Sequence, residues 1–224
     1  NKLINLFLIF FLLVFTNLHA IEADSFDENK PATIKSANAE FVYKFLLAEI
    51  ATQRGDLNTA GHIYFDLAKL TKSISLAERA TRIAGSARNG RLAMDSANIW
   101  QKLDKKSIEP KRILAELFIT SGNLAKARPL IKTLLEKEEK TRSEGFLYLN
   151  KILSQVENKK NALRFIIDIT KPYLNIPEAR FAIAHAAFSA GNKKLAIEEL
   201  DKIESINPKW ETAALFRGYI IGQE

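Results

Sequence analysis

Residues 177–210 read PEARFAIAHAAFSAGNKKLAIEELDKIESINPKW, and this stretch decides the fold. Two segments with apolar residues at helical spacing are joined at Ala190-Gly191-Asn192, and the second segment ends at Asn207-Pro208. Apolar residues three or four positions apart predict amphipathic helices, and Gly or Pro between such segments indicates where a helix ends. The stretch therefore predicts a pair of antiparallel helices.

The same pattern recurs along the chain. With Pro177 as position 1, position 20 is Ala196, where the two helices would cross closely, and alanine returns at this place with spacings of 33, 34, 35 and 34 residues: Ala60, Ala93, Ala127, Ala162 and Ala196. These spacings predict repeats over 41–73, 74–107, 108–142, 143–176 and 177–210, and a partial sixth repeat over 211–224. Position 15 is a turn glycine in Gly55, Gly122 and Gly191, whereas Arg88 and Glu157 predict less typical turns in repeats two and four.

The period and the small residue at position 20 resemble the tetratricopeptide repeat (TPR). This resemblance implies an all-α fold, a TPR-type α-solenoid in which antiparallel helix pairs stack in a right-handed superhelix. No linker or break in composition divides residues 38–222, so we expect a single solenoid. Trp100 stands at position 27 of repeat two, and we interpret it as a core residue.

The N-terminal residues predict export. Lys2 precedes the apolar run 3–15, LINLFLIFFLLVF, and the small residue Ala20 follows it, which is typical of a signal peptide over residues 1–20. A retained membrane anchor is the alternative, although a spanning helix needs roughly 20 apolar residues. Residues 21–37 are polar and predict a flexible lead-in. We therefore expect a periplasmic or secreted protein.

The sequence lacks the residues that several kinds of functional site require. The sequence has no cysteine, which excludes disulfides, thiolate metal sites and a lipoprotein anchor on an N-terminal cysteine. Its three histidines are scattered, and no phosphate-binding loop or nucleophile motif is present. We expect no enzyme activity, no cofactor and no metal.

In TPR arrays the ligand groove is lined by the first helix of each repeat, chiefly at positions 2, 5, 6, 9, 12 and 13, as the resemblance implies. A protein-binding groove is therefore expected at Phe45, Glu49, Arg79, Arg82, Arg112, Glu116, Tyr148, Lys151, Phe181, His185, Phe188, Phe216 and Tyr219. Exposed aromatic residues and arginines are the usual anchors of protein contacts. The alternative for Tyr148, Phe181, Phe188 and Phe216 is that they pack between neighbouring repeats.

The formal net charge of +7 requires an explanation. Many lysines fall near the ends of the predicted second helices, where cations oppose the helix dipole: Lys69, Lys72, Lys102, Lys105, Lys106, Lys137, Lys140, Lys171, Lys202 and Lys209. We interpret them as a solvated convex face, with contact to anionic membrane or cell wall as the alternative. Export argues against a nucleic-acid partner.

After repeat five, residues 211–224 provide one more first helix with apolar residues such as Leu215 and Ile221. This helix is either the polar-capped end that solenoids need or part of a longer array. We expect the longer array.

Residues 46–71, LLAEIATQRGDLNTAGHIYFDLAKLT, followed by AERATRIA at 77–84, resemble the N-terminal part of large TPR adaptor proteins of the Gram-negative envelope. Some of those proteins are outer-membrane lipoproteins that present cell-wall hydrolases to a processing protease. The resemblance implies a non-catalytic scaffold or adaptor that binds a protein or peptide in its concave groove. The alternative is an envelope structural protein that contacts membrane or cell wall through its basic face.

Overall fold

A computed structural model describes residues 33–223, with side chains from Ala39 onward. Residues 40–224 form one compact unit. The predicted signal peptide over 1–20, and the part of the lead-in before Thr33, lie outside the described residues.

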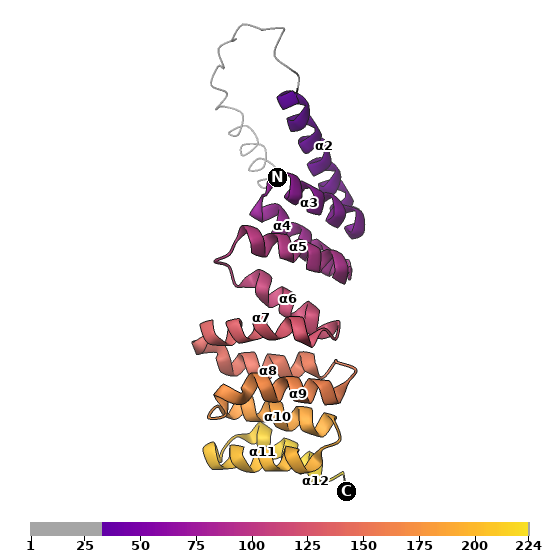
Figure 1. The fold of residues 1–224 in the computed structure, drawn as a ribbon. Helices are drawn as coiled ribbons and strands as arrows, with labels where there is room; N and C mark the ends of the chain where they lie inside the picture. The colour runs from indigo at the N-terminus through magenta and orange to yellow at the C-terminus, as the bar shows by residue number, and fades with distance from the viewer. Residues whose placement is uncertain (1–32, 224) are drawn as a thin grey trace, which may run out of the picture. The chain divides into compact units, whose positions relative to one another are not determined.

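Helices account for all the regular structure between residues 33 and 223, and they follow one another along a stack (Figure 1). They form pairs in chain order: α2 (Thr33–Gln53) with α3 (Leu57–Thr71), α4 (Ile74–Ser86) with α5 (Gly90–Leu103), α6 (Glu109–Thr120) with α7 (Leu124–Lys137), α8 (Arg142–Leu153) with α9 (Lys159–Thr170), and α10 (Pro177–Ser189) with α11 (Lys193–Ile206), followed by α12 (Glu211–Ile221). Two short 3-10 helices, η1 (Glu139–Thr141) and η2 (Lys171–Tyr173), lie in connections. The predicted all-α stack of helix pairs is confirmed.

Helix α2 differs from the expected lead-in, because it begins at Thr33 rather than after Ala37. Residues 33–37 are TIKSA, and none of them is glycine or proline. Nothing in these residues therefore interrupts a helix.

The recurring alanine is buried in every second helix. Ala60, Ala93, Ala127, Ala162 and Ala196 are each at most 3% exposed. Opposite them, the first helices also present small buried side chains at Ala48, Ala115 and Ala184. A methyl group on each side lets the two backbones approach closely, which larger side chains would prevent.

The turns within the pairs follow the glycine pattern in part. Gly55, Gly122 and Gly191 have φ values of 79°, 76° and 80°. Arg88 takes the same left-handed region at φ 55°, although this conformation is costly for a residue with a Cβ. The α8–α9 connection is different, because it spans residues 154–158 and buries Val156 at 5% exposure. Repeat four therefore has an atypical turn, as Glu157 predicts.

A side-chain cap begins every second helix. Asp56, Asn89, Asn123, Asn158 and Asn192 each accept a hydrogen bond from the backbone N–H three residues later. An oxygen at this place satisfies one of the backbone donors that a helix N-terminus leaves unpaired. These caps occupy position 16 of each repeat, so they recur with the same spacing as the alanines.

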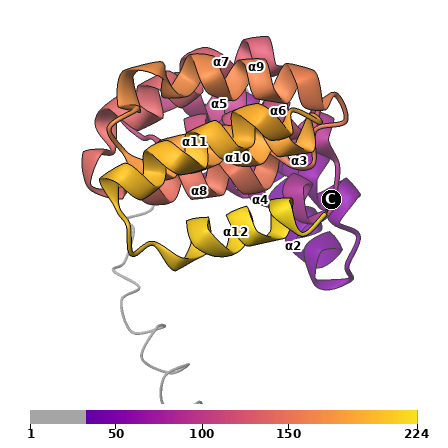
Figure 2. The same ribbon diagram turned by 90° about the horizontal axis from the view of Figure 1, so that it is seen from below.

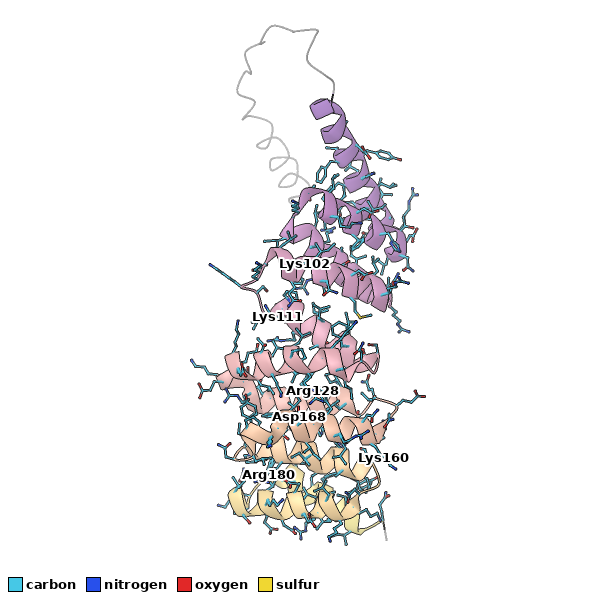
Figure 3. All side chains as sticks on the ribbon, in the orientation of Figure 1. Lys102, Lys111, Arg128, Lys160, Asp168 and Arg180 are labelled. Atoms are coloured by element: carbon cyan, nitrogen blue, oxygen red, sulfur yellow. The ribbon has the colours of Figure 1, made fainter. Side chains whose placement is uncertain are left out.

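Buried side chains gather in four clusters, most of which join neighbouring helix pairs. Trp100 is 4% exposed and packs in a cluster with Tyr64 and Leu67, which confirms its interpretation as a core residue. Ion pairs add links at the surface: Arg128 of α7 pairs with Asp168 of α9, and Figure 3 shows these two side chains side by side. Exposed pairs of this kind contribute about 0–1 kcal/mol, so packing rather than charge holds the stack together.

We predict that Asn192→Ala destabilises the fold by about 1 kcal/mol, because the N–H of Leu195 then loses its acceptor. Thermal and urea unfolding followed by circular dichroism measure the loss. Asn175→Ala is the matched control, since Asn175 is exposed in a turn and should tolerate the change within about 0.5 kcal/mol. Equal effects of the two substitutions would contradict the capping role.

Candidate protein-binding site

A cavity of about 460 Å³ opens between α6, α7 and α8. Its floor is apolar and comes from all three helices: Ala115, Ile131, Leu134, Leu135, Leu149 and Ile152. The remaining lining residues are polar or lack a side chain: Arg112, Glu116, Glu138, Thr141, Glu144, Gly145 and Tyr148. We call this the central pocket. Pockets of roughly 300–1,000 Å³ with apolar walls and a few polar groups are typical of ligand sites.

The charged residues of the central pocket are mostly acidic. Arg112 is its only cation, and it is held by two carboxylates: it pairs closely with Glu138, and its Nη1 lies 3.4 Å from Glu109 Oε1. Glu116 and Glu144 have no ion-pair partner among residues 39–223. One cation against three lining carboxylates gives the pocket a charge of −2.

Tyr148 stands at the lip of the central pocket and is 43% exposed. Partial burial, together with the neighbouring carboxylate of Glu116, raises the pKa of Tyr148 to about 12, while Arg112 opposes this shift. The phenol therefore stays protonated at neutral pH and remains a hydrogen-bond donor.

Gly145 leaves part of the pocket open. A Cβ built on Gly145 would meet only Leu135 Cδ2, at 3.7 Å, which is ordinary contact. The backbone of α8 does not need glycine here, since Gly145 has no positive φ. Glycine at this position therefore leaves space in the pocket and meets no requirement of the backbone.

Three of the predicted groove residues meet in this pocket: Arg112, Glu116 and Tyr148. Lys151 is exposed on the same helix but does not line the pocket. The prediction missed Glu138, because it follows the end of a second helix, and Glu144, although its place at position 2 of repeat four belongs to the groove pattern.

The predicted residues of repeats one and two pair with each other. Glu49 accepts a hydrogen bond from the Tyr64 hydroxyl and one from Arg79 Nη2 at 2.7 Å. The Arg79 guanidinium also lies 4.9 Å from the centre of the Tyr64 ring. Arg82 pairs with Glu78 on its own helix. Phe45 packs edge-on against Tyr64. These residues hold α2, α3 and α4 together.

The predicted aromatic residues near the C-terminal end also pack together. Phe181 contacts Phe216 and Trp210, and Phe216 contacts Phe188 and Tyr219. Figure 2, which looks at the stack from the end formed by α11 and α12, shows α12 beside α10 and α11. Phe181 is only 7% exposed, so its assignment to an open groove is corrected: it fills the space between α10 and α12. Tyr219 remains 53% exposed.

His185 lies in the same aromatic group. Its ring stacks on Phe216 with centroids 5.3 Å apart, and burial lowers its pKa below the usual value of 6.5. The imidazole is therefore neutral at pH 7.

Within residues 33–223, no group of three or more metal-ligating side chains lies close together. In the same part of the chain, no helix is both long and apolar enough to cross a membrane.

Residues 177–209 match the tetratricopeptide repeat family. The chain contains a tetratricopeptide repeat. This match covers α10 and α11, the stretch with the most regular sequence pattern, and the helix pairs before it have the same order of helices, buried alanine and capped turn.

A curated relative, a TPR repeat-containing protein of Pseudomonas aeruginosa, is 24% identical over 155 residues. The alignment covers 69% of this chain and 26% of the relative, so the chain spans about a quarter of that protein.

Solved structures of TPR proteins are similar to the chain at low identity. A protein titled YrrB, "a TPR protein with an unusual peptide-binding site", is 16% identical over 83% of this chain and 96% of its own, with a TM-score of 0.46. MamA is 13% identical over 77% of this chain and 94% of its own, with a TM-score of 0.48.

We predict that the chain becomes less stable as the pH falls below about 6.5, and that His185 contributes to this loss. Its folded pKa is lowered, so the unfolded state binds more protons and stability is lost as the pH falls through the folded value. Urea unfolding between pH 7.5 and pH 5 measures the effect. His185→Gln should flatten the profile, whereas His62→Gln, at an exposed position, should leave it unchanged. Identical slopes for the wild type and His185→Gln would contradict the assignment.

Proposed function

We propose that this protein is a non-catalytic TPR scaffold that binds a protein or peptide partner on the face formed by its first helices, at the central pocket. One observation carries this proposal. Arg112, Glu116 and Tyr148, from the first helices of two successive repeats, converge on one open pocket with an apolar floor. Such a preformed surface reduces the ordering cost of binding.

The charge pairs of the pocket support a preorganised surface. Arg112 is fixed by Glu109 and Glu138, so its position does not depend on a ligand. Tyr148 is half exposed at the lip and combines an aromatic face with a hydroxyl donor. Tyrosine and arginine in this setting are typical anchors of protein interfaces.

We place the protein in the periplasm because the sequence of residues 1–20 has the pattern of a signal peptide. There it would act as an adaptor in the assembly or proteolysis of envelope proteins. N-terminal sequencing of the mature protein tests the location: Ile21 should be the first residue, and retention of residues 1–20 would argue for an anchor.

A second candidate function rests on the lysines. The lysines expected on the convex face are all exposed, and among residues 39–223 only Lys202 of this set has an ion-pair partner, Glu199. Unpaired lysines attract anionic surfaces in a salt-dependent way. Sedimentation with phosphatidylglycerol vesicles tests this function, and no binding at low salt would eliminate it.

The main proposal predicts that a photo-crosslinking amino acid at Tyr148 captures a polypeptide partner in cells of the source organism. The same amino acid at Lys160 is the control, since Lys160 is exposed on α9 (Figure 3) and does not line the pocket. Mass spectrometry identifies the adducts.

Two outcomes would contradict the proposal. One is an equal set of adducts at Tyr148 and Lys160, which would show no preference for the first-helix face. The other is lipid or glycan at both positions without polypeptide, which would favour the second candidate function.

A further inference from the structure

We propose that the central pocket selects a cationic side chain, arginine or lysine, from an extended peptide segment of the partner. This inference rests on the proposed function and adds the chemistry of the residue that is recognised. It follows from the shape, the floor and the charge of the pocket.

The floor suits the stem of a long side chain. Ile131, Leu134 and Leu135 of α7 face Leu149 and Ile152 of α8 across the cavity, and each of these residues is at most 7% exposed. Arginine and lysine bury their methylene stems along apolar surfaces while the charged group stays near polar partners. At about 460 Å³ the pocket has room for one such side chain.

The negative charge of the pocket favours a positively charged ligand. Although the whole chain carries +7, the residues that line the pocket carry −2. Glu138 already pairs with Arg112, which leaves Glu116 and Glu144 to accept from a new cation. Glu144 lies in the first turn of α8, a place that acidic side chains favour because of the helix dipole.

Other side chains suit the pocket less well. An acidic side chain would meet three carboxylates and one cation that is already paired. A purely apolar side chain would remove Glu116 and Glu144 from water without providing a hydrogen-bond donor, which costs free energy. A guanidinium or ammonium group provides charge-assisted hydrogen bonds to both carboxylates.

Two steps test the inference. A randomised nonapeptide library is first selected on the purified chain, and the binding of the enriched peptides is then measured by fluorescence polarisation. We expect arginine or lysine to be enriched at one position. Replacing that arginine by citrulline, or that lysine by norleucine, should weaken binding about tenfold, because a charge-assisted bond is lost while the aliphatic stem of the side chain is kept.

Variants of the chain locate the effect. Gly145→Leu should abolish detectable binding by filling the pocket, whereas Gly145→Ala should retain it, since its Cβ makes only ordinary contact with Leu135. Glu116→Gln and Glu144→Gln keep the shape and should each weaken binding about fivefold. Glu198→Gln, exposed on α11, is the control and should bind like the wild type. Circular dichroism verifies that each variant is folded.

Two results would overturn the inference, and they are distinguishable. Enriched peptides without a cationic residue, or with binding that Gly145→Leu leaves unchanged, would refute the selective pocket and leave the protein-binding function in place. Failure to enrich any peptide would refute both.

Discussion

The close crossing of two helices at a buried alanine is the constraint on which the rest of the structure depends. Ala127 and its counterparts are buried in closely packed surroundings, which leave no room for a larger side chain. The Asp or Asn cap, four residues earlier, fixes where the second helix begins. Together they set the register of each pair, and the stack follows by repetition.

The candidate site lies where this repetition departs from its regular period. The spacing from Ala127 to Ala162 is 35 residues, one more than the 34-residue TPR period, and η1 lies between α7 and α8. Gly145 adds no side chain at this junction. These features leave an apolar cavity with carboxylates at its edge. A regular array thus supplies a rigid frame, and a local departure from regularity supplies the space for a ligand.

The fold could be predicted from sequence because its signals are local and repeated. Apolar spacing, alanine and turn glycine all agree at Pro177–Trp210, and the apolar spacing and the alanine agree again in the other repeats. The site could be predicted only in part, since the pattern places Arg112 and Tyr148 on a face but cannot show which neighbours they meet. Phe181 shows the limit: its place in the repeat is a groove position, yet α12 covers it. The pairing of Glu49 with Arg79 across two repeats could not be predicted from the sequence either.

The proposed function requires an open apolar pocket at Gly145. Because the sequence has no cysteine, Gly145→Cys and Lys160→Cys each give a single site for an environment-sensitive thiol fluorophore. The account predicts that the label at position 145 reacts in the folded protein and emits at a shorter wavelength than the label at position 160. A thiol at position 145 that stays unreactive, or a label whose emission equals that at position 160, would contradict it.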